Sequence, residues 1–98
     1  MNASKEEFCI AELGKICEGD FKTDKYSLDG PKECAVCIEK SRRGWRVYEK
    51  EKNSYNDSCL FDNVVEACLD FLKRMSPASD YKRLKWEFLD SIIAQKSA

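Results

Sequence analysis

The chain contains 98 residues, of which 43% are hydrophobic and 36% are charged, with six cysteines, no histidine and a formal net charge of -1. This length predicts one folded domain spanning residues 1–98. The lack of histidine excludes Ser-His-Asp catalysis, Cys-His catalysis and histidine-based zinc sites. The near-zero net charge excludes a strong overall field for nucleic acids or anionic membranes.

The N-terminal segment predicts the compartment. A secretion signal begins with basic residues followed by an apolar run. Residues 1–7 contain neither feature. No stretch of the sequence approaches the roughly 20 apolar residues that span a bilayer. We therefore expect a cytoplasmic protein whose cysteines stay reduced and are mostly small buried side chains.

Apolar residues at three- and four-residue spacing predict a first helix over residues 5–17. They are Cys9, Leu13, Ile16 and Cys17. Ser4 followed by Glu7 matches a capping box at the start of this helix, and Gly19 matches a stop at its end. Gly14 lies inside the helix, where glycine costs about 1 kcal/mol relative to alanine.

Alternating and β-branched residues predict strands over residues 33–39 and 45–49, paired as an antiparallel hairpin through the polar turn 41–44. A short edge strand over residues 59–61 follows a polar segment. Cys34, Val36 and Ile38 are expected to share one face of the first strand. In the second strand, Trp45 and Val47 are expected on one face, and Arg46, Tyr48 and Lys50 on the other.

A second helix is predicted over residues 63–75, with Asp62 as its N-cap and Pro77 ending it. A third helix follows, with a wide apolar stripe of Tyr81, Leu84, Phe88, Leu89, Ile92 and Ile93. Because the strands are consecutive and joined by short turns, we expect an α+β fold. A small antiparallel sheet of three to four strands would pack with about three helices.

Cys34 and Cys37 have the Cys-x-x-Cys spacing of redox pairs and zinc sites. In an extended strand, side chains three residues apart point to opposite faces and lie about 10 Å apart along the chain. We therefore expect no metal and no cofactor here. A cysteine-based metal or redox module stays an alternative.

Asp62, Glu66 and Asp70 recur every four residues and predict an acidic stripe on the outer side of the second helix. Such a stripe is either a solvated helix face or a docking surface for a basic partner. If the preceding loop folds alongside, further acidic candidates extend it, namely Asp57, Glu49 and Glu51.

The predicted hairpin is basic, with Lys40, Arg42, Arg43, Arg46 and Lys50 placed around Trp45 and Tyr48. Basic and aromatic residues together are typical of platforms for single-stranded nucleic acid. However, Trp45 is expected to face the core, and the neighbouring glutamates cancel part of the charge. We therefore expect a solvated hairpin tip, where Arg42 and Arg43 are candidate contacts for a protein partner, and keep a small nucleic-acid-binding domain as an alternative.

Several segments resemble a family of small bacterial immunity proteins. They are Cys-Ile-Glu-Lys at 37–40, Trp-Arg-Val-Tyr-Glu-Lys-Glu-Lys at 45–52, and Phe61 leading into Glu-Ala-Cys-Leu-Asp-Phe-Leu at 66–72. The likeness covers residues 33–75, although the segment after Tyr48 lacks the Arg-Gly usual in that family. Similar proteins are encoded beside polymorphic toxins, including contact-dependent growth inhibition systems.

The resemblance implies an antitoxin and not an enzyme, with no catalytic residues. It implies a cytoplasmic inhibitor that binds the C-terminal catalytic domain of a cognate toxin, with a nuclease as the expected activity. Many such toxins have basic substrate-binding surfaces, which an acidic stripe would complement. Neither direct nucleic-acid binding nor membrane binding is expected.

Overall fold

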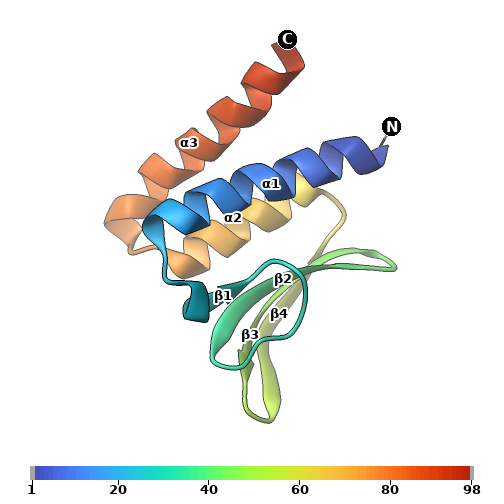
Figure 1. The fold of residues 1–98 in the computed structure, drawn as a ribbon. Coiled ribbons are helices and arrows are strands. Elements are labelled where there is room, and N and C mark those ends of the chain that lie inside the picture. The colour runs from blue at the N-terminus through green and yellow to red at the C-terminus, as the bar shows by residue number, and fades with distance from the viewer. Residues whose placement is uncertain (1, 98) are drawn as a thin grey trace.

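The computed structural model describes the backbone of residues 2–97 and the side chains of residues 5–94. Its elements are α1 (Asn2–Asp20), the short 3-10 helix η1 (Thr23–Lys25), β1 (Tyr26–Ser27), β2 (Ala35–Ser41), β3 (Gly44–Glu51), β4 (Ser54–Phe61), α2 (Val64–Met75) and α3 (Ala78–Ser97). The three long helices gather on one side of the sheet (Figure 1). The expected α+β class is confirmed. None of the helices that residues 2–97 form combines the length and the apolar character needed to span a bilayer.

The four strands are ordered β1-β2-β3-β4 in a mixed sheet. The hairpins β2–β3 and β3–β4 are antiparallel, as expected, but β1 pairs with β2 in parallel through Tyr26 and Ser27. The expectation of a wholly antiparallel sheet is therefore wrong at this edge. A strand of two residues carries no alternation from which its pairing direction could be predicted.

Two strand boundaries differ from the predicted ones. β2 begins at Ala35, because Cys34 takes a left-handed conformation with φ 59° while its N–H donates to the carbonyl of Lys50 at 2.8 Å. Cys34 therefore lies outside the strand and does not share a face with Val36 and Ile38. β4 covers Ser54–Phe61, whereas only residues 59–61 were predicted.

Helix α2 begins one residue later than its periodicity predicted and ends at Met75 as predicted, and it contacts β2, β3 and β4 as well as α1 and α3. Its buried side chains are Val64, Ala67, Cys68, Phe71 and Leu72. They join one core with Trp45 and Val47 from β3, so the predicted inward face of that strand is confirmed. On the opposite face of the sheet, Tyr48 is fully buried beside Ala35 and Cys37.

The predicted helix starts are wrong in two places. α1 begins at Asn2 and continues to Asp20, so Ser4 lies within the helix and is not its N-cap. The N-cap of α2 is Asn63 and not Asp62, because the Asn63 side-chain oxygen accepts the N–H groups of Val65 at 2.7 Å and Glu66 at 3.4 Å. Asp62 therefore precedes the cap.

Gly44, the first residue of β3, lies close to the backbone at the end of β4. Its φ of 144° is a conformation that side chains disfavour, and a Cβ atom there would lie 2.2 Å from the carbonyl oxygen of Phe61 and 3.4 Å from the Cα of Asp62. Only glycine permits this approach, which brings the Arg42–Arg43 turn next to Asp62.

We expect Gly44→Ala to lower the free energy of unfolding by about 2–4 kcal/mol, because it adds both a clash and backbone strain. Urea denaturation followed by circular dichroism measures this. Gly19→Ala is the matched control: nothing lies within 4 Å of its added Cβ, and in a helix it should stabilise the protein by about 0.5–1 kcal/mol. Equal stability of Gly44→Ala and the parent protein would contradict the close approach.

Candidate functional site

The acidic residues of α2 lie along its exposed side. Asp62 and Glu66 are exposed at the N-terminal end, and the Asp70 side chain, one turn further on, is 24% exposed. A helix of 12 residues is about 18 Å long. The predicted acidic stripe therefore exists, although its first member, Asp62, lies before the helix.

Arg74, which sequence reasoning did not identify as a site residue, organises the C-terminal end of this surface. Its Nε donates to Asp70 Oδ2 at 2.9 Å, its Nη2 donates to the backbone carbonyl of Asp57, and its Nη1 lies 3.8 Å from Glu49 Oε2. The side chain is only 11% exposed. Three of the predicted acidic candidates thus converge on one guanidinium. The Asp-x-x-x-Arg spacing within α2 is the sequence signal that could have indicated the first of these contacts.

Asp57 contributes to this cluster through its backbone because β4 contains a β-bulge. Val47 pairs with Cys59 and Glu49 pairs with Asn56, so Asp57 and its neighbour lie opposite the single residue Tyr48. Asp57 has a φ of 51°, a left-handed conformation that aspartate tolerates better than most residues. The bulge turns the Asp57 carbonyl toward α2, where Arg74 binds it.

The remaining candidates divide between the two ends of α2. Glu51 is exposed and lies with Glu49 on the wall of a hollow that Arg74 also lines. Arg42 and Arg43 are exposed in the β2–β3 turn. The turn lies beside Asp62 because of Gly44. The structure therefore brings all of the predicted residues to one side of α2 or to its ends, but it does not bring them into a single cluster.

The aromatic residues of the basic hairpin are not available as a stacking platform. Trp45 is 7% exposed and its Nε1 donates to Glu6 Oε2 at 2.9 Å, while Lys40 Nζ binds the same carboxylate at 2.6 Å. These hydrogen bonds, first that from Lys40, lower the pKa of Glu6. Tyr48 is fully buried and its hydroxyl donates to Glu39 Oε1 at 2.5 Å. This arrangement ties α1 to the hairpin and removes both rings from the nucleic-acid alternative.

The Cys-x-x-Cys segment does not have the environment of a reactive pair. Cys34 is exposed just before β2, whereas Cys37 is fully buried with its Sγ 3.7 Å from the carbonyl oxygen of Lys32. Burial raises the pKa of the Cys37 thiol, which favours the unreactive protonated form. Among the side chains that the structure describes, no group of three or more His, Cys, Asp or Glu residues is placed to hold a metal ion.

We expect Arg74→Ala to lower the free energy of unfolding by about 2–3 kcal/mol, because it leaves the Asp57 carbonyl and the Asp70 carboxylate without their donor. Urea denaturation measures the change. Lys73→Ala, which removes an exposed cation from the same turn of α2, is the control and should change stability by less than about 0.5 kcal/mol. Similar small losses in both variants would show that Arg74 does not hold α2 to the bulge.

The site is thus an acidic surface along α2, with free carboxylates at its N-terminal end and an arginine-centred cluster at its C-terminal end. Comparisons of the chain with protein-family models, with curated proteins and with solved structures found no match.

Proposed function

We propose that this protein is a cytoplasmic immunity protein that binds and neutralises the C-terminal domain of a cognate bacterial toxin, with a nuclease as the expected activity. The observation that carries the proposal is the acidic surface along α2. Residues 53–72, which form β4 and most of α2, contain four acidic residues and no basic one. The resemblance of residues 33–75 to small immunity proteins supports the same function.

The N-terminal half of this surface is the better candidate for contact with a basic partner. In the part of the chain that the structure describes, Asp62 and Glu66 form no ion pair, whereas Asp70 and Glu49 already face Arg74. A free carboxylate can pair with a partner's lysine or arginine without first giving up an internal contact. Docking at this end would cover the basic groove through which a nuclease binds its substrate.

The β2–β3 turn adds specificity at the edge of this contact. Arg42 and Arg43 are exposed in the turn before Gly44, whose backbone lies close to the Cα of Asp62. Arginine is favoured in protein interfaces, and its charge would repel a uniformly basic surface at this edge. A matching toxin would therefore carry cations over the helix and an acidic or neutral group opposite the turn.

The double variant Asp62→Lys with Glu66→Lys tests the surface. We expect the dissociation constant for the cognate toxin domain to rise about tenfold or more, mainly because like charges now face each other across the interface. A candidate toxin domain, catalytically inactivated, is titrated against the parent protein and the variant by calorimetry. Asp70 is left unchanged in this test because its reversal would also break the contact with Arg74.

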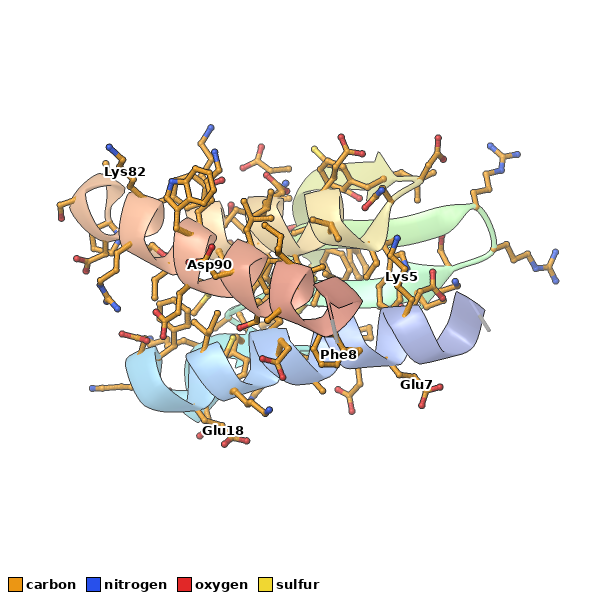
Figure 2. The ribbon with its side chains drawn as sticks, turned by 90° about the horizontal axis from the view of Figure 1, so that it is seen from above. Lys5, Glu7, Phe8, Glu18, Lys82 and Asp90 are labelled. Atoms are coloured by element: carbon orange, nitrogen blue, oxygen red, sulfur yellow. The ribbon has the colours of Figure 1, made fainter. Side chains whose placement is uncertain are left out.

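The matched control is Glu18→Lys with Asp90→Lys, which changes the net charge equally on the helical side of the molecule (Figure 2). Both residues are exposed. This variant should bind with nearly the parent affinity. An equal loss in both variants would mean that only the overall charge matters. Parent affinity in the Asp62 and Glu66 variant, with an unchanged circular dichroism spectrum, would move the interface away from α2.

A further inference from the structure

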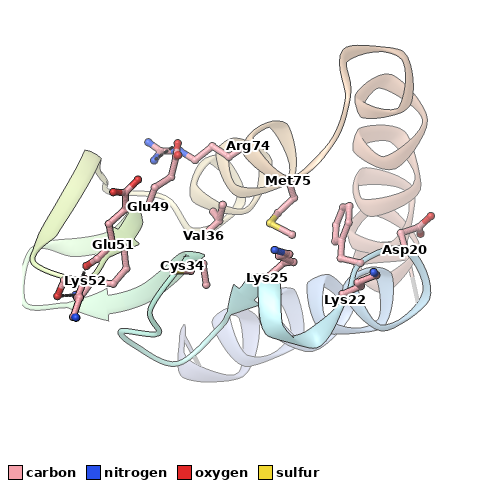
Figure 3. Close-up of a pocket in the computed structure, with 13 residues that line it drawn as sticks. Asp20, Lys22, Lys25, Cys34, Val36, Glu49, Glu51, Lys52, Arg74 and Met75 are labelled. Atoms are coloured by element: carbon pink, nitrogen blue, oxygen red, sulfur yellow. Dashed lines mark hydrogen bonds and ion pairs between the residues drawn. The ribbon is translucent and has the colours of Figure 1, made fainter.

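A hollow of ≈ 730 Å³ lies beside the arginine-centred cluster. It is bounded by the end of α1 and η1 on one side, by the ends of β2 and β3 on the other, and by the last turn of α2. Figure 3 shows Lys25 and Met75 in its middle, with Lys22 and Asp20 to one side and Glu49, Glu51 and Lys52 to the other. This volume is in the range of ordinary ligand sites.

The hollow combines apolar and charged walls. Phe21, Val36 and Met75 provide apolar surface, while five basic and three acidic residues also line it. Pockets that hold organic ligands have this composition, in which apolar contacts supply the affinity and a few charges fix the orientation. The sign of the charges on the walls that have no partner within the protein therefore indicates the charge of a suitable ligand.

Four of the eight charged residues on the walls have a partner within the protein. The Asp20 carboxylate lies 3.2 Å from the Arg83 guanidinium, and Glu49 faces Arg74. Glu51 and Lys52 carry opposite charges at adjacent positions in the chain, and neither side chain forms an ion pair within the described residues. Lys50 Nζ donates to the carbonyl of Glu51 at 2.5 Å and lies over the ring of Tyr55, 5.0 Å from its centroid.

Lys22 and Lys25 belong to the other half of the charged wall residues, and Asp24 lies between them in the chain. Within the described part of the chain, neither ammonium group has a hydrogen-bond or ion-pair partner. Both side chains start from the same short turn, because the N–H of Lys25 donates to the carbonyl of Lys22 at 3.0 Å. Two exposed ammonium groups without a partner among the described residues thus lie on the same wall as the apolar surface of Phe21 and Met75.

We propose that this hollow binds an acidic side chain of a protein partner, together with the apolar residues next to it. The carboxylate would lie between Lys22 and Lys25, and the apolar neighbours would cover Val36 and Met75. The inference rests on the proposed function only for the identity of the partner. The hollow lies next to the acidic surface, because Glu49 belongs to both. A toxin bound at both places would present cations to α2 and one carboxylate to the hollow.

The test uses the full chain and a capped pentapeptide with one central glutamate between two leucines. Titration followed by ¹⁵N NMR should shift the amide signals around Lys25, Val36 and Met75. The same peptide with glutamine in place of glutamate should bind at least fivefold more weakly. The double variant Lys22→Gln with Lys25→Gln should raise the dissociation constant of the glutamate peptide about five- to tenfold.

The control Lys5→Gln with Lys82→Gln removes two exposed lysines that do not line the hollow, and it should bind like the parent protein. Equal binding of the glutamate and glutamine peptides, shifts at another surface, or no shifts at millimolar peptide would each overturn the proposal. So would equal binding of sodium hexanoate or inorganic phosphate, since either would show that no peptide is required. Because no toxin is used, these failures are distinct from a failure of the proposed function.

Discussion

Helix α2 has to bury side chains against two layers at once, because the strands β2, β3 and β4 contact it and α1 and α3 contact it as well. Its buried side chains leave only a narrow exposed strip, in which Glu66, Asp70 and Lys73 lie. The acidic surface is thus a consequence of packing. Charged residues are tolerated on this helix only along that strip, so a partner that recognises them must approach from this one direction.

The charge along the strip is uneven. At its C-terminal end Arg74 binds Asp70 and the Asp57 carbonyl, and this connects the helix to the edge of the sheet. At its N-terminal end, the Asn63 side chain accepts hydrogen bonds from the first N–H groups of the helix. The Glu66 carboxylate is therefore not needed to cap the helix. One end therefore serves the fold and the other is available for binding, although both carry acidic residues at the same spacing.

The parts of the fold that the sequence predicted are those with strong periodicity. The apolar spacing between Val64 and Met75 gave α2 within one residue, and the alternation around Trp45 gave the correct inward face of β3. β4 was largely missed because Ser54 to Ser58 are polar and almost wholly exposed, so their extended conformation comes from pairing with β3 and not from propensity.

The candidate site was predicted only in part for a related reason. The acidic residues were visible as a pattern, but Arg74 is a basic residue in the last turn of a helix, where it has an ordinary role opposite the helix dipole. Its contacts with Glu49 and Asp57 join residues 25 and 17 positions apart in the chain. Only the folded hairpin brings them together.

The bulge at Asp57 has a consequence for how the protein behaves among its own copies. β4 is the last strand of the sheet and is exposed along almost its whole length, with Tyr55 56% and Leu60 47% exposed. An uninterrupted edge of this kind would recruit the edge of another molecule and extend the sheet between them. The left-handed Asp57 interrupts this edge with a bulge, which is one of the devices that keep exposed strands from pairing edge to edge. The same residue that accepts the hydrogen bond from Arg74 thereby also makes the exposed edge of the sheet a poorer template for another strand.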